Sequence, residues 1–107
     1  RWESVKRQVV WSRIALDDLK AQIAYIAAEN PAAAQRVSDM IGKTAAALSE
    51  IPTGRPGRVT GTYEKSVSRL PYVIAYAISS SPVGEVIAII RVIHTARDWP
   101  AEQWPEV

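Results

Sequence analysis

The chain has 107 residues, 48% of them hydrophobic and 22% charged, and a formal net charge of +2. This size and composition predict one domain over residues 1–107. The small positive charge permits an acidic partner but does not require a nucleic acid, because nucleic-acid binding would need a strongly basic stripe. The absence of cysteine excludes disulfides and thiolate metal sites, and a single histidine argues against a zinc site built by the protein. The sequence has no apolar run of about 18 residues, and its N-terminus lacks the apolar core of a secretion signal, so we expect a cytoplasmic protein with no membrane partner. We also expect no metal and no cofactor.

The first predicted elements are a strand and a helix. Gln8-Val9-Val10-Trp11 is a short apolar run, too short for a helix and rich in β-branched and aromatic residues, which indicates a strand over residues 6–11. Ser12 is a favourable cap for a following helix, and Asp17 and Asp18 lie near the positive end of that helix. Apolar residues recur there three or four positions apart and predict one buried helix face: Leu16, Leu19, Ile23 and Ile26.

A second helix is predicted from the pair Asn30-Pro31. Asn is a favoured cap, and Pro is favoured at the first helical position, where its missing N–H costs nothing. Apolar positions again repeat at helical spacing: Val37, Met40, Ile41, Thr44, Leu48 and Ile51. Because the connection is so short, we expect the two helices to fold back as an antiparallel hairpin.

The second half of the chain predicts strands. Residues 51–57 contain two prolines and two glycines, so the helical half ends there. Turn residues divide the rest into strands at residues 58–60, 63–69, 72–79 and 86–94, followed by a short helical turn within residues 96–104. Both faces of the strand at 72–79 are apolar, which predicts a central strand covered on one side by the hairpin. The order of elements predicts an α+β fold, with the helical hairpin packed on a small, mainly antiparallel sheet.

Basic residues gather between positions 55 and 69. One acidic residue, Glu64, accompanies four basic ones there: Arg55, Arg58, Lys65 and Arg69. On charge count alone, the favoured interpretation is a solvated strand face that protects the sheet edge. The functional alternative is a surface that contacts an anionic target.

The last predicted strand carries one arginine among isoleucines. Strand alternation gives Arg91 three isoleucine neighbours on its own face: Ile87, Ile89 and Ile93. A buried arginine needs a carboxylate partner, and Glu64 on a nearby strand is the partner that we expect. A structural ion pair is therefore favoured over an anion contact for Arg91.

His94, at the end of that strand, is the one side chain suited to proton transfer near neutral pH. A lone histidine at a strand end is more often structural, unless a second acid or base faces it. Trp99 is expected to cover the edge of the core. The sequence shows no Gly-rich phosphate loop, metal-ligand spacing or Ser/His/Asp signature, so residue patterns alone assign no catalytic group.

Several segments, taken in their order and spacing, resemble the RelE/ParE superfamily, the toxins of type II toxin–antitoxin modules. They are Ala15-Leu16-Asp17-Asp18-Leu19, Ile23-Ala24-Tyr25-Ile26 with Asn30-Pro31, Gly54-Arg55-Pro56-Gly57-Arg58, Pro71-Tyr72-Val73-Ile74-Ala75-Tyr76, and Ile90-Arg91-Val92-Ile93-His94 with Arg97-Asp98-Trp99-Pro100. The resemblance covers nearly the whole chain. It implies a helical hairpin against a small antiparallel sheet, and a role in growth inhibition and plasmid stabilisation.

The superfamily divides by target. Members of the RelE branch are ribosome-dependent mRNA endonucleases, which typically carry an arginine after the aromatic residue, where this chain has Val73 after Tyr72. For a nuclease, the resemblance implies Lys65, Arg69 and His94 as the catalytic residues. Members of the ParE branch inhibit DNA gyrase without an accepted catalytic set, and the last two predicted strands here look more like that branch.

The resemblance therefore implies a DNA gyrase inhibitor in which no residue is catalytic, with an mRNA endonuclease acting on the ribosome as the alternative. A third interpretation is a degenerate relative that binds only its antitoxin. The candidate contacts to a target are basic: Arg58, Lys65, Arg69 and Arg97.

The resemblance also implies a cognate antitoxin, ParD-like or RelB-like, in a hetero-oligomer with the toxin. Such antitoxins add a helix or a strand to exposed apolar grooves. The candidate surface is the first predicted helix, through Leu16, Leu19 and Ile23, together with the sheet edge.

Overall fold

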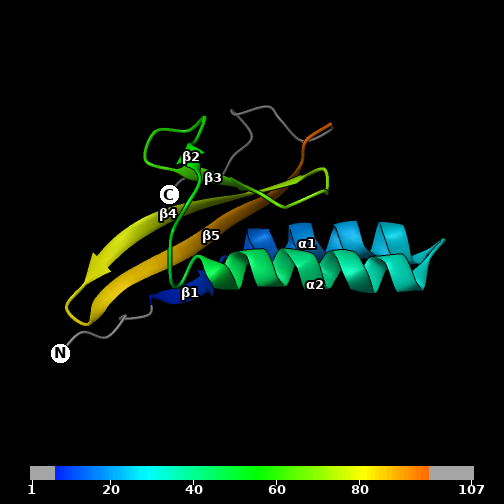
Figure 1. The fold of residues 1–107 in the computed structure, drawn as a ribbon, viewed down its shortest axis with the longest axis horizontal. Coiled ribbons are helices and arrows are strands. Elements are labelled where there is room, and N and C mark those ends of the chain that lie inside the picture. Colours follow the sequence, from blue (N-terminus) through cyan, green and yellow to red (C-terminus); the bar gives the residue numbers. More distant parts are fainter. Residues whose placement is uncertain (1–6, 97–107) are drawn as a thin grey trace.

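The computed structural model describes residues 7–96, which form two helices packed against a five-stranded sheet (Figure 1). The elements are β1 (Gln8–Trp11), α1 (Arg13–Ala27), α2 (Pro31–Ala47), β2 (Arg55–Pro56), β3 (Tyr63–Ser66), β4 (Tyr72–Ser81) and β5 (Gly84–His94). The strand order is β1-β5-β4-β3-β2, with β1 parallel to β5 and every other pair antiparallel. The predicted α+β fold is confirmed. Neither helix in this part of the chain is long and apolar enough to cross a membrane.

Both helices begin at the caps that the sequence predicts. Ser12 Oγ accepts the Ala15 N–H at 3.0 Å and donates to the Ile90 carbonyl at 3.1 Å, so one hydroxyl caps α1 and ties it to β5. Asn30 Oδ1 accepts the Ala33 N–H at 3.0 Å, and a proline follows at the first helical position. The short connection turns the chain back, and the predicted antiparallel hairpin is confirmed (Figure 1).

The strand β4 is the middle strand of the sheet, as its two apolar faces predict. Every residue from Tyr72 to Ala77 is buried. The side chains on its helix-facing side join those of neighbouring elements in one core cluster: Ala15, Ile41, Ala45, Leu48, Val67, Tyr72, Ile74, Tyr76, Ile87, Ile89 and Val92. Removal of this apolar surface from water, at about 25 cal/mol per Å², is the main force that holds the helices on the sheet.

The buried stripe predicted for α1 is partly wrong. Leu16 is 38% exposed, whereas Ala15 is fully buried. Ser12 ties the first turn of α1 to β5, and the residue that this turn presents to the strand is Ala15. Leu19 packs against the core, and Ile23 is half-buried.

The strand predicted at residues 58–60 is wrong. A two-residue strand, β2, lies just before that position and pairs with β3. Residues 58–60 leave the sheet because the Arg58 N–H donates to the Glu64 carboxylate at 2.9 Å instead of joining a strand ladder.

Two other boundaries differ from the prediction. The strand expected to reach Arg69 ends at Ser66, and Arg69 lies in the following turn with φ of 65°, a left-handed conformation that strands do not contain. The last two strands run further than expected, so that only Pro82 and Val83 connect them.

The expected helical turn beyond Ala96, together with the candidates Arg97 and Trp99, lies outside the described residues.

A bulge in β5 changes which side chains share a face. Arg91 and Ile89 lie opposite consecutive residues of β4, so Ile90 is an extra residue between them. The alternation shifts by one position, and Val92 instead of Arg91 continues the helix-facing row of Ile89. The expectation that Arg91 shares a face with the isoleucines before the bulge is therefore wrong, since only Ile93, beyond the bulge, lies on its face.

The carboxylate partner of Arg91 is Asp18 of α1, not Glu64. Arg91 Nε and Nη2 donate to the two Asp18 oxygens at 2.7 and 3.1 Å. Glu64 lies two strands away from Arg91, because Ala75 of β4 is paired with both of them. At the usual strand spacing, the backbones of Glu64 and Arg91 are therefore roughly 10 Å apart. The predicted structural ion pair is present, but the acid predicted for it is wrong.

Asp18 also completes the edge of the sheet. The ladder between β1 and β5 ends at the pair Trp11 and Ile89, so β5 continues beyond its neighbour. The Val92 N–H on this edge donates to Asp18 Oδ2 at 3.0 Å, where the carboxylate takes the place of a strand carbonyl. One carboxylate therefore links α1 to both a side chain and the backbone of β5.

We expect Asp18→Ala to lower the free energy of unfolding by about 2–4 kcal/mol, because it leaves the Arg91 guanidinium and the Val92 N–H without their shared acceptor. Asp17→Ala is the matched control, since Asp17 is exposed on the same helix, and it should change stability by less than about 0.5 kcal/mol. Urea denaturation of the two variants measures the difference. Equal stability of the two variants would contradict the role given to Asp18.

Candidate functional site

The basic candidates lie on different sides of the sheet. Arg58 follows β2, in the loop whose backbone binds Glu64. Lys65 lies opposite Ile74 of β4 and therefore faces the helices, whereas Glu64 faces the other way. Arg69 lies in the turn between β3 and β4. The structure thus does not gather the basic candidates into one site.

His94, the candidate for proton transfer, lies at the end of β5 opposite Tyr72. The two rings meet edge to face, with centroids 5.3 Å apart, and His94 Nδ1 accepts the Ala96 N–H at 3.2 Å. Between His94 and Lys65, on the same face of the sheet, stand the buried core side chains Ile74 and Val92. Within residues 7–96, no three His, Cys, Asp or Glu side chains cluster so as to hold a metal ion.

A buried carboxylate organises the loop before β3. Glu64 is 2% exposed, and it accepts from Arg55 Nη2 at 3.0 Å and from the Arg58 N–H at 2.9 Å. Arg58 Nε lies 4.0 Å from the same carboxylate. The sequence pattern did not identify Arg55 as a partner of Glu64, although the two lie directly opposite each other in β2 and β3. A two-residue strand is too short to show the alternation by which strands are recognised.

Two glycines allow close backbone contacts in this loop: Gly57 lies against Thr62 at the end of the loop, and Gly54 lies against Glu64 of β3. A Cβ at Gly54 would lie 2.6 Å from the Glu64 carbonyl oxygen, and a Cβ at Gly57 would lie 2.2 Å from Thr62 Oγ1. The Gly57 N–H donates to the Thr62 carbonyl at 2.8 Å, and Thr62 Oγ1 donates to the Val59 carbonyl at 2.6 Å. We refer to residues 54–62 as the 54–62 loop. These contacts within the loop and with β3 hold its backbone in one conformation.

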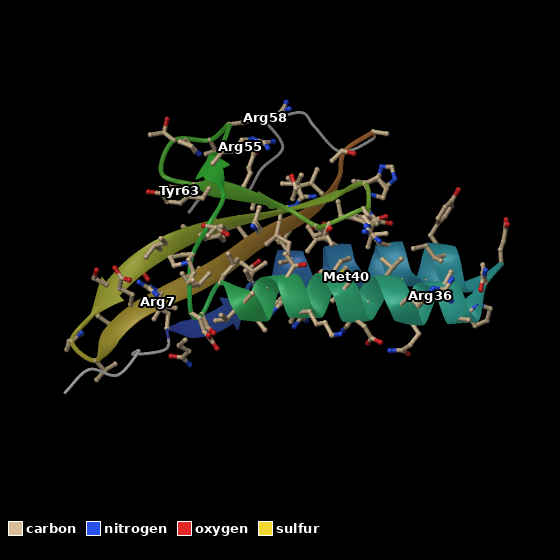
Figure 2. All side chains as sticks on the ribbon, in the orientation of Figure 1. Arg7, Arg36, Met40, Arg55, Arg58 and Tyr63 are labelled. Carbon is tan, nitrogen blue, oxygen red and sulfur yellow. The ribbon has the colours of Figure 1, made fainter. Side chains whose placement is uncertain are left out.

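Two hollows lie beside α2, one along the helix and one at its end. The larger one, about 710 Å³, lies between α2 and the turn that follows β3, where Val37, Met40 and Leu70 supply apolar walls. Arg36 and Arg69 also line it, and Figure 2 shows Arg36 and Met40 on α2. The smaller hollow, about 370 Å³, lies at the end of α2 and includes Lys65. Each hollow thus combines apolar lining with at least one cation.

Tyr76 holds the segment between α2 and β2. Its hydroxyl donates to the Thr53 carbonyl at 2.6 Å, and its ring stacks on Tyr63 with centroids 5.6 Å apart. Burial, with a smaller contribution from Tyr63, raises the pKa of Tyr76 above the ordinary value of 10.0. Tyr76 therefore remains a neutral hydrogen-bond donor at neutral pH and serves the core.

The chain is similar to known toxins along most of its length. Residues 9–99 match the family model for the ParE toxin of the type II toxin–antitoxin system parDE. The chain is 38% identical over 96 residues to Y4kP of Sinorhizobium fredii, which is named as a toxin; the match covers 89% of this chain and 95% of the relative. It is also 38% identical over 90 residues to toxin RelE2 of Caulobacter vibrioides, covering 84% and 97% of the two chains.

Solved structures share the fold. A chain of the chromosomal ParDE system from P. aeruginosa superimposes with a TM-score of 0.75 at 23% identity, over 85% of this chain and 98% of that one. A chain of the RelBE2 toxin–antitoxin complex of Mycobacterium tuberculosis superimposes with a TM-score of 0.60 at 25% identity, over 86% and 94%. Together with the family model, these matches assign the chain within the RelE/ParE superfamily. The chain belongs to the ParE toxin family and is a toxin of a type II toxin–antitoxin system.

Proposed function

We propose that this toxin arrests growth by binding DNA gyrase through its surface, without a catalytic residue of its own. The observation that carries the proposal is the separation of the groups that a nuclease would bring together. Lys65 and His94, two of the three residues implied for a nuclease, stand on either side of the buried core residues Ile74 and Val92. A surface without a convergent site suits an inhibitor that acts by contact.

Position 73 supports the same proposal. The ribonuclease branch typically carries an arginine there, and this chain has Val73, which is 2% exposed. A preorganised donor that stabilises charge in the transition state contributes roughly 3–4 kcal/mol in comparable sites. A buried valine supplies none of this stabilisation.

The second candidate function is ribosome-dependent cleavage of mRNA. It draws support from the relative named toxin RelE2 and from the fold shared with the RelBE2 complex. In that case Lys65 and Arg69 would hold phosphate, and His94 would act as the general acid or base. A chain that only bound its antitoxin would show neither activity.

We expect the purified toxin to inhibit DNA supercoiling by gyrase, and His94→Ala to leave this inhibition within about twofold, because no proton transfer is involved. A supercoiling assay across toxin concentrations measures both. The control adds the same preparation to translating ribosomes, where mRNA should remain intact. Ribosome-dependent mRNA cleavage that His94→Ala abolishes would contradict gyrase inhibition and favour the nuclease.

We also propose that a cognate antitoxin, ParD-like or RelB-like, neutralises the toxin in a hetero-oligomer. The ParDE and RelBE2 structures with this fold come from toxin–antitoxin systems. On α1, the candidate surface exposes Leu16, with the half-buried Leu19 and Ile23 beside it on the same helix. An apolar segment of the antitoxin could add a helix or strand against this surface.

The larger hollow beside α2 is a second part of the antitoxin surface in this proposal. Met40 is 39% exposed at its margin, and Arg36 and Arg69 contribute positive charge. We therefore expect the antitoxin segment to combine apolar side chains with acidic ones, because complementary charge selects the partner and its register.

Leu16→Asp and Met40→Asp are each expected to weaken binding of the antitoxin encoded beside the toxin by about tenfold or more, since each places a charge in an apolar contact. Val83→Asp is the control, because Val83 is exposed at the distant hairpin between β4 and β5. Titration calorimetry on the three variants measures the effect. If both variants bound like the Val83→Asp control, neither surface would be the antitoxin site.

A further inference from the structure

We infer that the 54–62 loop is the surface with which the toxin holds its protein target, and that Arg55 and Arg58 bind carboxylate groups on that target. The inference rests on the proposed function in one respect, namely that the target is a protein. It adds the loop, the chemistry of the contact and the residue that positions it.

One buried carboxylate holds the guanidinium of Arg55 and the backbone of Arg58. Glu64 Oε1 accepts from the Arg55 guanidinium, and Oε2 accepts from the Arg58 N–H. Glu64 lies opposite Ala75 of the middle strand, so the anchor is fixed to the rigid part of the sheet. Ordering a long side chain costs about 0.5–1.5 kcal/mol when a complex forms. Arg55 has already lost part of that freedom because Glu64 holds its guanidinium, and Arg58 starts from a backbone position that Glu64 fixes.

The loop backbone is also set before any partner binds. The hydrogen bonds of Gly57 and Thr62 close the loop, and the close approach of Gly54 to Glu64 leaves no room for a side chain at position 54. A preformed loop that carries two arginine side chains is suited to recognition, because the partner meets hydrogen-bond donors on a backbone that is already ordered.

The anchored arginines still reach solvent. The side chain of Arg55 is 59% exposed and that of Arg58 is 50% exposed, while the Glu64 side chain is 1% exposed. Figure 2 shows both arginines on the side of the molecule away from the helices. Residues 54–62 contain two arginines and no acidic residue, so this stretch of the chain is positively charged. The planar guanidinium group matches a carboxylate through two parallel hydrogen bonds.

The distribution of charge favours a protein target over a nucleic acid. Proteins that hold a nucleic-acid backbone neutralise several phosphates at once with Lys and Arg side chains. Among the described residues near the loop, Lys65 points to the helix side, so the two arginines do not continue into a basic stripe. A pair of carboxylates on a protein surface matches a pair of arginines more closely.

The experiment compares growth arrest after induction with the affinity of purified toxin for gyrase. We expect the double variant Arg55→Ala/Arg58→Ala to lose growth arrest and to bind gyrase about tenfold or more weakly, as loss of central arginine contacts does in other interfaces. Binding of the antitoxin should be unchanged and serves as the check on folding, because the α2 hollows and α1 lie on the other side of the sheet.

Two further variants separate recognition from charge. Lys20→Ala/Lys43→Ala removes two exposed cations from the helices and should leave growth arrest unchanged. Glu64→Gln makes the chain more positive by one charge but weakens the contacts of Glu64 with the Arg55 guanidinium and with the Arg58 N–H. We expect it to weaken growth arrest, whereas a general attraction by positive charge would strengthen it.

If the double alanine variant does not bind antitoxin, it is not folded, and Arg55→Lys/Arg58→Lys is used in its place. The lysine variant keeps the charge but loses the planar guanidinium group. Wild-type growth arrest by that variant would overturn the inference. Wild-type growth arrest and gyrase affinity in a folded Arg55→Ala/Arg58→Ala variant would also overturn it, as would an equal loss in the lysine control. Wild-type toxin that does not bind gyrase would contradict the proposed function instead, and growth arrest by the variants would still test the loop.

Discussion

The contact of Asp18 with β5 fixes the layer of helices to the sheet. Strand β1 is short, so the edge of β5 beyond Ile89 would otherwise lack an acceptor for the Val92 N–H. Asp18 supplies that acceptor and pairs with Arg91 through the same two oxygens. The ion pair is only partly exposed, so solvent screens it less than a surface pair. Apolar burial holds the helices on the sheet, and this carboxylate, together with Ser12, fixes where α1 meets β5.

Once the helices are placed, the sheet has two sides with different properties. The helix side carries the core and, along α2, hollows in which apolar walls meet Arg36, Arg69 and Lys65. Glu64 faces the other side and holds the 54–62 loop with its arginines. A toxin that meets both a target and an antitoxin can thus use separate surfaces for the two. In this account the antitoxin occupies the helix side and the target meets the loop.

Local patterns predicted the elements, and the errors arose where distant segments meet. Ser12 and Asn30 were identifiable as caps because their partners lie three residues away in the chain. The partner of Arg91 was not, because a bulge at Ile90 moves every later side chain of β5 to the opposite face, and no residue type marks the bulge. Asp18 looked like a residue favoured by the helix dipole, yet its oxygens serve a strand 73 residues away. The division of the candidate basic residues between the two sides of the sheet depends on strand register, which residue types alone do not reveal.

Induction of the toxin in growing cells, with DNA synthesis and message integrity followed together, separates contact with gyrase from catalysis. If the toxin acts by contact on gyrase, DNA synthesis stops first, with induction of the SOS response, while mRNA remains uncut. Early cleavage of mRNA at codon-defined positions, with DNA synthesis continuing, would rule out action by contact on gyrase alone.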